Sequence, residues 1–489
     1  MVIASVLTII IQLTKTEFAV GEDPTLTLEL LYTGSGSLIV SEPVAGSGMP
    51  MFRIVDLASG AERIVRTPTE FPGVRARVEL ESGTPHKSYH KLSRFVTFNS
   101  PGKYAISAIY QWNDGKDSAE SEPIVITING LGVRNMAINN PSFRHGLLTF
   151  INPASDPPDL MLADLVLEPG GGVRRIKPIA KASLLASPVS SVPSNQNPTM
   201  GQWVAWIEGD TIKAVHVGDT LGPTTLALFK VTSGSMVIGP IYAAVNKSNL
   251  TRGHGAAAIL HKHPLKGAEI IAIDLKADKE TAEAVEVARV GVPQSPAWIG
   301  SLYRIDPADK QLAFITTAPG RFMIHGAPWP KAGDSELKAT KIAEWEGDFV
   351  AAGANIDHND VIRGCALAWM GPPEERSLEV LSWKVGPDGA SDSEPLGALP
   401  WPHANPIQTI KVRTRTNGSP TILLRSALGE WHVFDSKFQG KVFEPFARTD
   451  LPIDVAFVSD TEAVLVIAQI GGGILVKRLS GADLPPVQR

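Results

Sequence analysis

The stretch WVAWIEGDTIKAVHV, residues 203–217, sets the pattern for most of this chain. Two apolar runs flank Glu208-Gly209-Asp210, and such runs around a short glycine-containing turn predict a β-hairpin. The first run returns six more times, at steps of 42 to 56 residues. The seven copies are LLTFI from 147, WVAWI from 203, AAAIL from 256, QLAFI from 311, CALAW from 365, TILLR from 421 and AVLVI from 463. A second strand-like run follows each copy, so the repeats predict a seven-bladed β-propeller.

The composition supports an all-β protein. Apolar residues make up 43% of the 489 residues and charged residues 19%, which is typical of a folded chain. The 44 glycines and 38 prolines suit many short strands separated by turns better than they suit helices. The repeats carry no WD dipeptide at a fixed position and no kelch-type or sialidase-type signature, so they predict a propeller of no specific family.

The first 130 residues contain no repeat of this kind. They show short strand-like runs separated by turn signals, which predict a β-sandwich. PGKYAISAIYQW (101–112) resembles strand F of an immunoglobulin-like domain, with Tyr104 at the tyrosine-corner position and Ile106 two residues later. Together with FAVGEDPTLTLELLYTGSG (18–36), it resembles bacterial Ig-like domains of the intracellular proteinase inhibitor type. The resemblance implies a fold, and no inhibitor activity is carried over.

The predicted organisation is therefore an Ig-like sandwich over residues 1–130 and a seven-bladed propeller over 131–489. NGLGVRNMAINN (130–141) is interpreted as the connection between them. The seventh repeat has three clear strands where the others have four, and an incomplete blade would expose a long strand edge. We expect a segment between the sandwich and the first blade to supply the missing outer strand.

Charge and cysteine content exclude several classes of protein. With 45 basic and 50 acidic residues, the net charge of −5 argues against a nucleic-acid partner. The sequence contains no run of 18 apolar residues, so it predicts no transmembrane helix. MVIASVLTIIIQLTK at the start is interpreted as a first strand rather than a signal peptide. One cysteine, Cys365, favours the cytoplasm, although exported bacterial proteins without disulfides leave the compartment open.

No catalytic or metal motif stands out. His254, His261 and His263 are the best metal candidates, but no carboxylate is near in sequence, so structural histidines are favoured. Asp357-His358-Asn359-Asp360 lacks the spacing of a calcium loop and is interpreted as a turn. Cys365 lies in an apolar run, typical of a buried, inert thiol. We predict no metal, no cofactor and no catalytic residue.

Two sets of residues are candidates for binding. Trp298, Trp329 and Trp401 have prolines nearby and are predicted as interface anchors or as lids on blade edges. Arg413 and Arg415 alternate on the innermost strand of the sixth repeat, where they line the predicted channel. They are expected to meet an anion or a carboxylate of another blade, and a structural ion pair is the favoured interpretation.

The sequence predicts a non-enzymatic protein-binding scaffold, a structural subunit of a larger assembly whose partners are other proteins. The alternative is a propeller enzyme or carbohydrate-binding protein with a polar site at the channel mouth. Such a site takes one side chain from each blade and leaves no local motif.

Overall fold

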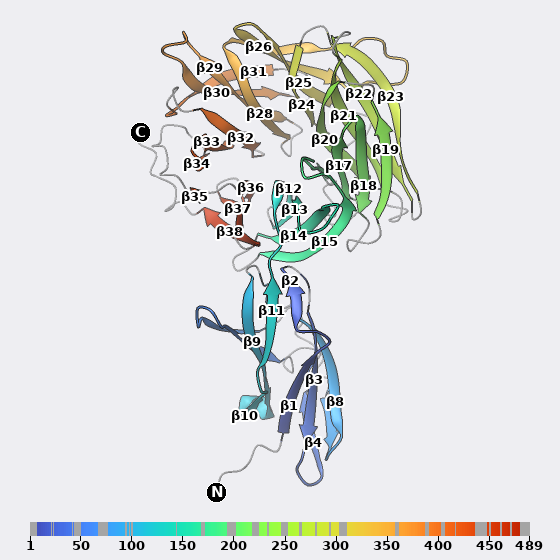
Figure 1. Ribbon diagram of the computed structural model, residues 1–489, viewed down its shortest axis with the longest axis vertical. Helices are drawn as coiled ribbons and strands as arrows, with labels where there is room; N and C mark the ends of the chain where they lie inside the picture. Colours follow the sequence, from blue (N-terminus) through green and yellow to red (C-terminus); the bar gives the residue numbers. More distant parts are fainter. Residues whose placement is uncertain are drawn as a thin grey trace. The chain divides into compact units, whose positions relative to one another are not determined.

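The structure is a computed structural model. It describes residues 7–479 except for 21, 23, 42, 44–49, 67–76, 93–94, 97, 99–100, 143, 168–171, 193–201, 218–223, 232–233, 246–252, 264–266, 279–280, 293–294, 303–310, 357–360, 387–390, 402–405, 416, 436–446, 449–450, 460–461 and 470–471. The described residues are almost entirely β-strands, so the all-β prediction is confirmed (Figure 1). They contain no helix that is long and apolar enough to cross a membrane.

The chain divides into two compact units. The first is residues 1–132 with 170–176 and 469–475, and the second is 133–169 with 177–468 and 476–489. The strands up to residue 129 are β1 (Leu7–Leu13), β2 (Glu17–Ala19), β3 (Thr25–Tyr32), β4 (Ser37–Ser41), β5 (Met51–Asp56), β6 (Glu62–Val65), β7 (Arg77–Glu81), β8 (Pro85–Lys91), β9 (Gly102–Trp112), β10 (Asp117–Glu120) and β11 (Ile124–Asn129). A 3-10 turn, η3 (Asn113–Gly115), joins β9 to β10.

These N-terminal strands form two main sheets. One has the order β1-β3-β8, and the other has the order β2-β11-β9-β5-β6 with β10 also paired to β9. Buried and exposed side chains alternate along β1, as they do in a strand with one face on a core. Residues 7–13 therefore form a strand, as predicted. Tyr104 and Ile106 are both buried on β9, but the immunoglobulin-type assignment itself stays a resemblance.

The remaining strands form seven consecutive blades. Their bounds are β12 (Arg134–Ser142), β13 (His145–Asn152), β14 (Asp159–Val166), β15 (Val173–Lys181), β16 (Val189–Val192), β17 (Gln202–Glu208), β18 (Thr211–Val217), β19 (Thr224–Lys230), β20 (Ser235–Val245), β21 (Gly253–His263), β22 (Gly267–Ala277), β23 (Ala282–Val292), β24 (Ser295–Leu302), β25 (Gln311–Ala318), β26 (Arg321–Pro328), β27 (Thr340–Glu346), β28 (Asp348–Ile356), β29 (Ile362–Met370), β30 (Ser377–Val385), β31 (Ser391–Leu399), β32 (Ile407–Thr414), β33 (Pro420–Ser426), β34 (Glu430–Asp435), β35 (Ala447–Arg448), β36 (Ile453–Phe457), β37 (Ala463–Gln469) and β38 (Gly473–Leu479).

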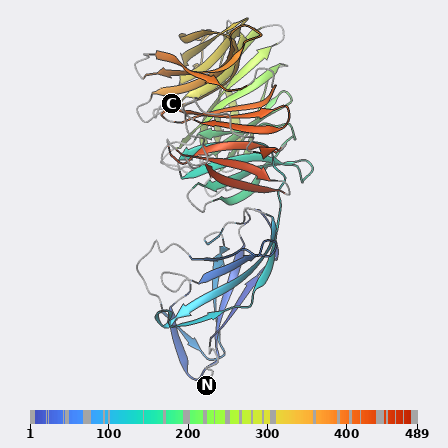
Figure 2. The ribbon, with the colours of Figure 1, turned by 90° about the vertical axis from the view of Figure 1, so that its left-hand side faces the viewer.

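Each of blades 1 to 6 is an antiparallel meander of four strands, taken in chain order from β12 to β35. Blades 2 and 3 join into one sheet because β16 and β20 pair in parallel. Blade 7 is β36-β37-β38, and the innermost strands β36 and β12 lie side by side, which closes the ring. Figure 1 shows the blades around the ring, and Figure 2 shows their strands on edge.

The ring closes differently from the prediction. The segment expected to complete blade 7 instead forms β12, the innermost strand of blade 1, and residues 130–133 are not in a strand. Among the described residues no fourth strand joins β38. The physical reason is that apolar residues of this segment, such as Met136 and Ile138, are buried, which suits an innermost strand better than an exposed outer one.

The stretch at 203–217 folds as predicted. β17 and β18 pair from Glu208 with Thr211 onward, and Gly209 has a φ of 64°, which glycine adopts without strain. Trp203 packs between blades 2 and 3, whereas Trp206 packs between blades 1 and 2. Successive strand residues point to opposite faces, so one continuous apolar run fills two interfaces between blades.

Candidate functional site

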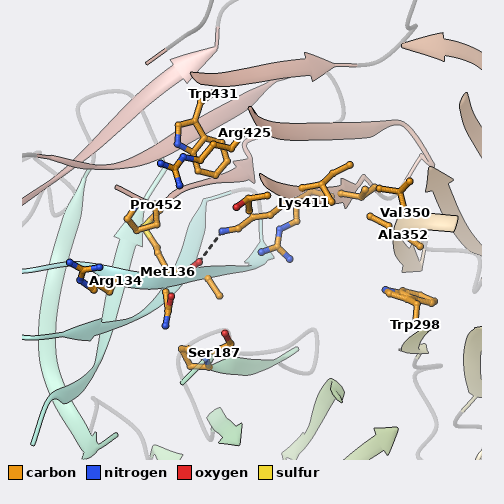
Figure 3. Close-up of a pocket in the computed structure, with 18 of the residues that line it drawn as sticks. Arg134, Met136, Ser187, Trp298, Val350, Ala352, Lys411, Arg425, Trp431 and Pro452 are labelled. Carbon is orange, nitrogen blue, oxygen red and sulfur yellow. Dashed lines mark hydrogen bonds between the residues drawn. The ribbon is translucent and has the colours of Figure 1, made fainter. Parts of the chain in front are cut away.

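A cavity of about 730 Å³ lies at the beginnings of the innermost strands (Figure 3). A volume between roughly 300 and 1,000 Å³ is typical of ligand sites in proteins. Its described lining comes from blades 1, 2, 4, 5, 6 and 7, so six of the seven blades build this channel cavity and no single motif encodes it. The residues that line it are Val133, Arg134, Asn135, Met136, Ala137, Ser187, Pro188, Ala297, Trp298, Phe349, Val350, Ala351, Ala352, Thr409, Ile410, Lys411, Val412, Arg413, Arg425, Trp431, Leu451 and Pro452.

One side of the cavity is positively charged. Its cationic side chains come from β12, β32 and β33, and we call them the basic wall: Arg134, Lys411, Arg413 and Arg425. The described lining contains no aspartate, glutamate, histidine or tyrosine. Lys411 and Arg413 are two residues apart on β32, so both point to the same side of that strand. The wall therefore favours an anion.

Asp454, on β36 of blade 7, lies behind the basic wall and is fully buried. Its two oxygens accept hydrogen bonds from Arg413 at 3.1 and 2.6 Å, and Lys411 Nζ lies 3.4 Å from Oδ2. The backbone N–H groups of Ile138 and Val455 donate to the same carboxylate at 3.0 and 2.9 Å. Burial alone would raise the pKa of Asp454, but the charges of Arg413 and Lys411 and these hydrogen bonds lower it to about 2.

Lys411 joins three blades. Its Nζ donates to the backbone oxygen of Met136 in blade 1 at 2.9 Å and to that of Ile453 in blade 7 at 3.1 Å. Burial lowers the pKa of Lys411, and the charge of Asp454 opposes that change. For Arg413, the charge of Asp454 and its hydrogen bond outweigh burial and raise the pKa.

The charges at this side of the cavity do not cancel. The guanidinium groups of Arg134 and Arg413 carry two positive charges against the single carboxylate of Asp454, which leaves at least one in excess. Arg134 is exposed at the cavity, and within the described part of the chain it has no ion-pair partner. A partly enclosed surface with excess charge attracts counter-charged ligands more strongly than a flat one does.

The side contributed by blades 4 and 5 is apolar. We call it the apolar wall: Ala297, Trp298, Phe349, Val350, Ala351 and Ala352. Each of these side chains is half-buried, and Trp298 packs on the core between the two blades. A Cβ on Gly300 would overlap the Trp298 ring, so the absence of a side chain at Gly300 lets the indole lie along β24.

The three predicted tryptophans take two different kinds of position in the structure. Trp298 lines the cavity, whereas Trp329 and Trp401 are 8% and 5% exposed within the propeller. Trp329 packs in the core between blades 3 and 4, and Trp401 packs between blades 5 and 6 with its ring edge-on to His432. Their burial does not favour the role of interface anchors, since little indole surface remains for a partner.

The structure also places the two predicted arginines, Arg413 and Arg415, in different surroundings. Arg413 meets the carboxylate of another blade at the cavity wall. Arg415 follows the end of β32, within the turn in which the N–H of Gly418 donates to its carbonyl. Its side chain is directed into blade 6, where it pairs with Asp435. If β32 continued, strand alternation would place Arg413 and Arg415 on the same face. Arg415 lies in the turn after the strand, so alternation does not apply to it.

The remaining candidates take structural positions or lie outside the described residues. His261 is buried and its Nδ1 lies 2.7 Å from Glu269 Oε1. The side chain of His254 and all of 357–360 lie outside the described part of the chain. The described residues contain no group of three or more His, Cys, Asp or Glu placed to hold a metal ion. Burial raises the pKa of Cys365 to about 12, as expected of an inert thiol.

The sequence analysis missed most of the cavity. Lys411 precedes Arg413 by two residues, and this alternation was a usable signal. Asp454 was another, because a single carboxylate within the apolar run PIDVAF needs a buried partner. Arg134 lies in the segment interpreted as a linker, so no signal pointed to it. Convergence of one strand from each blade is a property of the ring and is not visible locally.

No family model matches the chain, and no curated protein matches it. Three similar solved structures are the WD40 domain of SCAP from fission yeast, the NanB sialidase of Streptococcus pneumoniae and an α-L-arabinanase of Penicillium chrysogenum. Their identities are 11%, 8% and 11%, and their TM-scores are 0.38, 0.35 and 0.34. They cover 72%, 98% and 73% of this chain and 91%, 93% and 94% of their own. At these values the likenesses carry no argument about substrate or partner.

One prediction needs correction. The sequence analysis predicted that the protein is not an enzyme, and this is contradicted, since a sialidase and an arabinanase are among the similar structures. The absence of a local catalytic motif was weak evidence because propeller sites take single side chains from several blades.

Proposed function

We propose that this chain is a protein-binding propeller whose channel cavity accepts an anionic group of its partner. The excess positive charge at the cavity carries the proposal. Asp454 and the backbone oxygens of Met136 and Ile453 hold Lys411 and Arg413 in fixed positions. Binding to such a site loses little side-chain entropy because the cations are already ordered. A role as a subunit of a larger assembly belongs to the same proposal.

The test uses two short peptides and isothermal titration calorimetry. One is acetyl-Glu-Glu-Glu-Phe with a free carboxylate, and the other is its uncharged counterpart, acetyl-Gln-Gln-Gln-Phe amide. We expect the acidic peptide to bind and the uncharged one to bind at least about tenfold more weakly, a difference of ~1.4 kcal/mol. The affinity should fall as salt is raised, because part of the cavity is open to water.

Arg134→Ala is the informative variant, because Arg134 takes no part in the Asp454 cluster. We expect it to weaken binding of the acidic peptide about tenfold. Lys230→Ala is the matched control, since it removes one positive charge from β19, the outer strand of blade 2. Equal affinity of the acidic peptide for the original protein and for Arg134→Ala would contradict the proposal.

We also propose that residues 1–130 and 131–489 are separate domains and that the first is immunoglobulin-like. The order β1-β3-β8 in one sheet and β2-β11-β9-β5-β6 in the other supports this proposal, together with the buried Tyr104 and Ile106. Expression of residues 1–130 alone tests it. A folded fragment with a cooperative thermal transition is expected, and an unfolded fragment would contradict it.

A further inference from the structure

The two walls of the channel cavity meet at blades 5 and 6. The basic wall belongs to blades 1 and 6, beside Asp454 of blade 7, and the apolar wall belongs to blades 4 and 5. β28 of blade 5 packs beside β32 of blade 6, so Val350 and Ala351 lie close to the strand that carries Lys411 and Arg413. Figure 3 shows Arg134 of blade 1 across the cavity from Trp298, Val350 and Ala352. The cavity therefore offers cationic and apolar groups next to one another, which suits a ligand with an anionic group beside an apolar one.

A second hollow of about 410 Å³ adjoins the apolar wall, because Ala297 and Phe349 line both. We call it the side hollow. It lies between blades 4 and 5, and its other lining residues are Thr317, Ala318, Pro319, Arg321, Gly347 and Asp348. A ligand whose apolar part contacts Phe349 can therefore continue outward between these blades.

The side hollow is polar, but its charges are compensated. Arg321 lies 3.4 Å from Glu344, and Asp348 lies 2.7 Å from Arg376. A polyanion that ran from the cavity into this hollow would bring negative charge to Asp348, which is unfavourable. Hydroxyl and charged groups there can bond a neutral, polar chain. The anionic part of the ligand is therefore confined to the basic wall.

We infer that the occupant is the carboxyl-terminal segment of a polypeptide that ends in an aromatic or large apolar residue. Its terminal carboxylate meets Lys411, Arg413 and Arg134, and its last side chain lies against the apolar wall beside Trp298. The preceding residues pass through the side hollow. A chain terminus places one carboxylate next to one apolar side chain, which matches a cavity in which a basic wall and an apolar wall meet. This inference rests on the proposed function and specifies the partner of that same site.

The first test compares three peptides by calorimetry: acetyl-Gln-Gln-Gln-Phe as the free acid, the same peptide as the amide, and acetyl-Glu-Glu-Glu-Phe amide. We expect the free acid to bind at least tenfold more tightly than either amide. If the acidic amide binds as tightly as the neutral free acid, acidic side chains suffice. The inference that the site recognises a terminal carboxylate is then overturned, while the proposed function stands. If Arg134→Ala changes the affinity for none of the peptides, both the inference and the proposed function are overturned.

The second test separates a polypeptide end from a free small carboxylate. N-acetyl-phenylalanine offers the same carboxylate and ring without a preceding chain. We expect the tetrapeptide acid to bind more tightly than N-acetyl-phenylalanine, by threefold or more. Equal affinities would show that the side hollow is not used and would overturn the polypeptide part of the inference.

The third test concerns the apolar wall. In Trp298→Ala we expect the affinity for acetyl-Gln-Gln-Gln-Phe to fall about tenfold and that for acetyl-Gln-Gln-Gln-Gly to stay within twofold. The glycine-ended peptide also reports that the variant is folded and that its basic wall is intact. An equal loss for both peptides, or no loss for either, would overturn the placement of the last side chain beside Trp298.

Discussion

Arg413 and Arg415 are two residues apart, yet the structure gives them different roles. Arg413 lies at the cavity wall, shares Asp454 with Lys411, and keeps a third of its side chain exposed at 35%. Arg415 is 1% exposed, bonds both oxygens of Asp435 at 2.5 and 2.9 Å, and lies 4.5 Å from the ring of Phe457. The cluster around Asp454 has excess positive charge that water can reach. The Arg415–Asp435 pair has no net charge and is closed to water, and we call it the sealed pair.

The difference shows how one residue type can serve binding or stability. A sealed pair with matched charges cannot attract a ligand, and its contribution is to the packing of blade 6. A cluster with more cations than carboxylates, at a concave surface, retains charge for a ligand. Four predictions can break or sharpen this comparison, and they are taken from the largest expected effect to the smallest.

Asp435→Asn should have the largest effect on stability. It leaves Arg415 buried without a counter-charge, and breaking a buried pair in this way costs about 3–5 kcal/mol of the free energy of unfolding. Urea denaturation followed by tryptophan fluorescence measures it. Replacing both partners, with Arg415→Met and Asp435→Leu, should recover most of the loss. A loss below 1 kcal/mol in Asp435→Asn would show that the pair is not sealed.

The pH dependence of stability should reveal Asp454. Its pKa falls from an ordinary 3.8 to about 2 in the folded protein, so folding favours the ionised carboxylate. The resulting stability, about 2 kcal/mol, is fully present above pH 4–5 and is lost as the pH falls towards 2. Urea denaturation at pH 7, 4 and 2 measures it. In Asp454→Asn this part of the pH dependence should disappear, and an unchanged profile would contradict the assignment.

Arg413→Lys should have a smaller effect. Lysine keeps the charge but cannot bond both oxygens of Asp454, and we expect a loss of about 1 kcal/mol. The partly exposed site lets water replace the lost hydrogen bond. Arg415→Lys, the matched variant at the sealed site, should cost more because no water reaches it. Equal losses in urea denaturation would remove the distinction between the two clusters.

Arg134→Ala should have the smallest effect on stability. An exposed arginine outside the Asp454 cluster contributes within about 0.5 kcal/mol to the free energy of unfolding. The same variant is expected to weaken peptide binding about tenfold. A thermal melt alongside the calorimetry separates the two effects. A large loss of stability would place Arg134 with the structural cluster rather than with the ligand.

The sequence predicted the repeats well and the site poorly. Continuous apolar runs such as WVAWI are visible locally, because their residues fill the interfaces on both sides of a blade. The outer strand β31, Ser391–Leu399, is harder to recognise in the sequence. An outer strand is exposed on an edge and tolerates Pro395 and Gly397, so its sequence resembles a loop.

The cavity depends on contacts that span the whole chain. Asp454 bonds Ile138, which is 316 residues away in the sequence, and Lys411 bonds Met136, which is 275 residues away. No local pattern encodes such meetings. The direction of Arg415 was hidden for a different reason, since strand alternation no longer fixes the side-chain direction of a residue that follows the end of β32.

The most direct measurement is a crystal structure of the protein with acetyl-Gln-Gln-Gln-4-bromophenylalanine. The account predicts the terminal carboxylate within hydrogen-bond distance of Lys411, Arg413 or Arg134, and an anomalous bromine peak beside Trp298. A peptide bound outside the channel cavity, or one lying in it with its carboxylate turned away from the basic wall, would contradict the account.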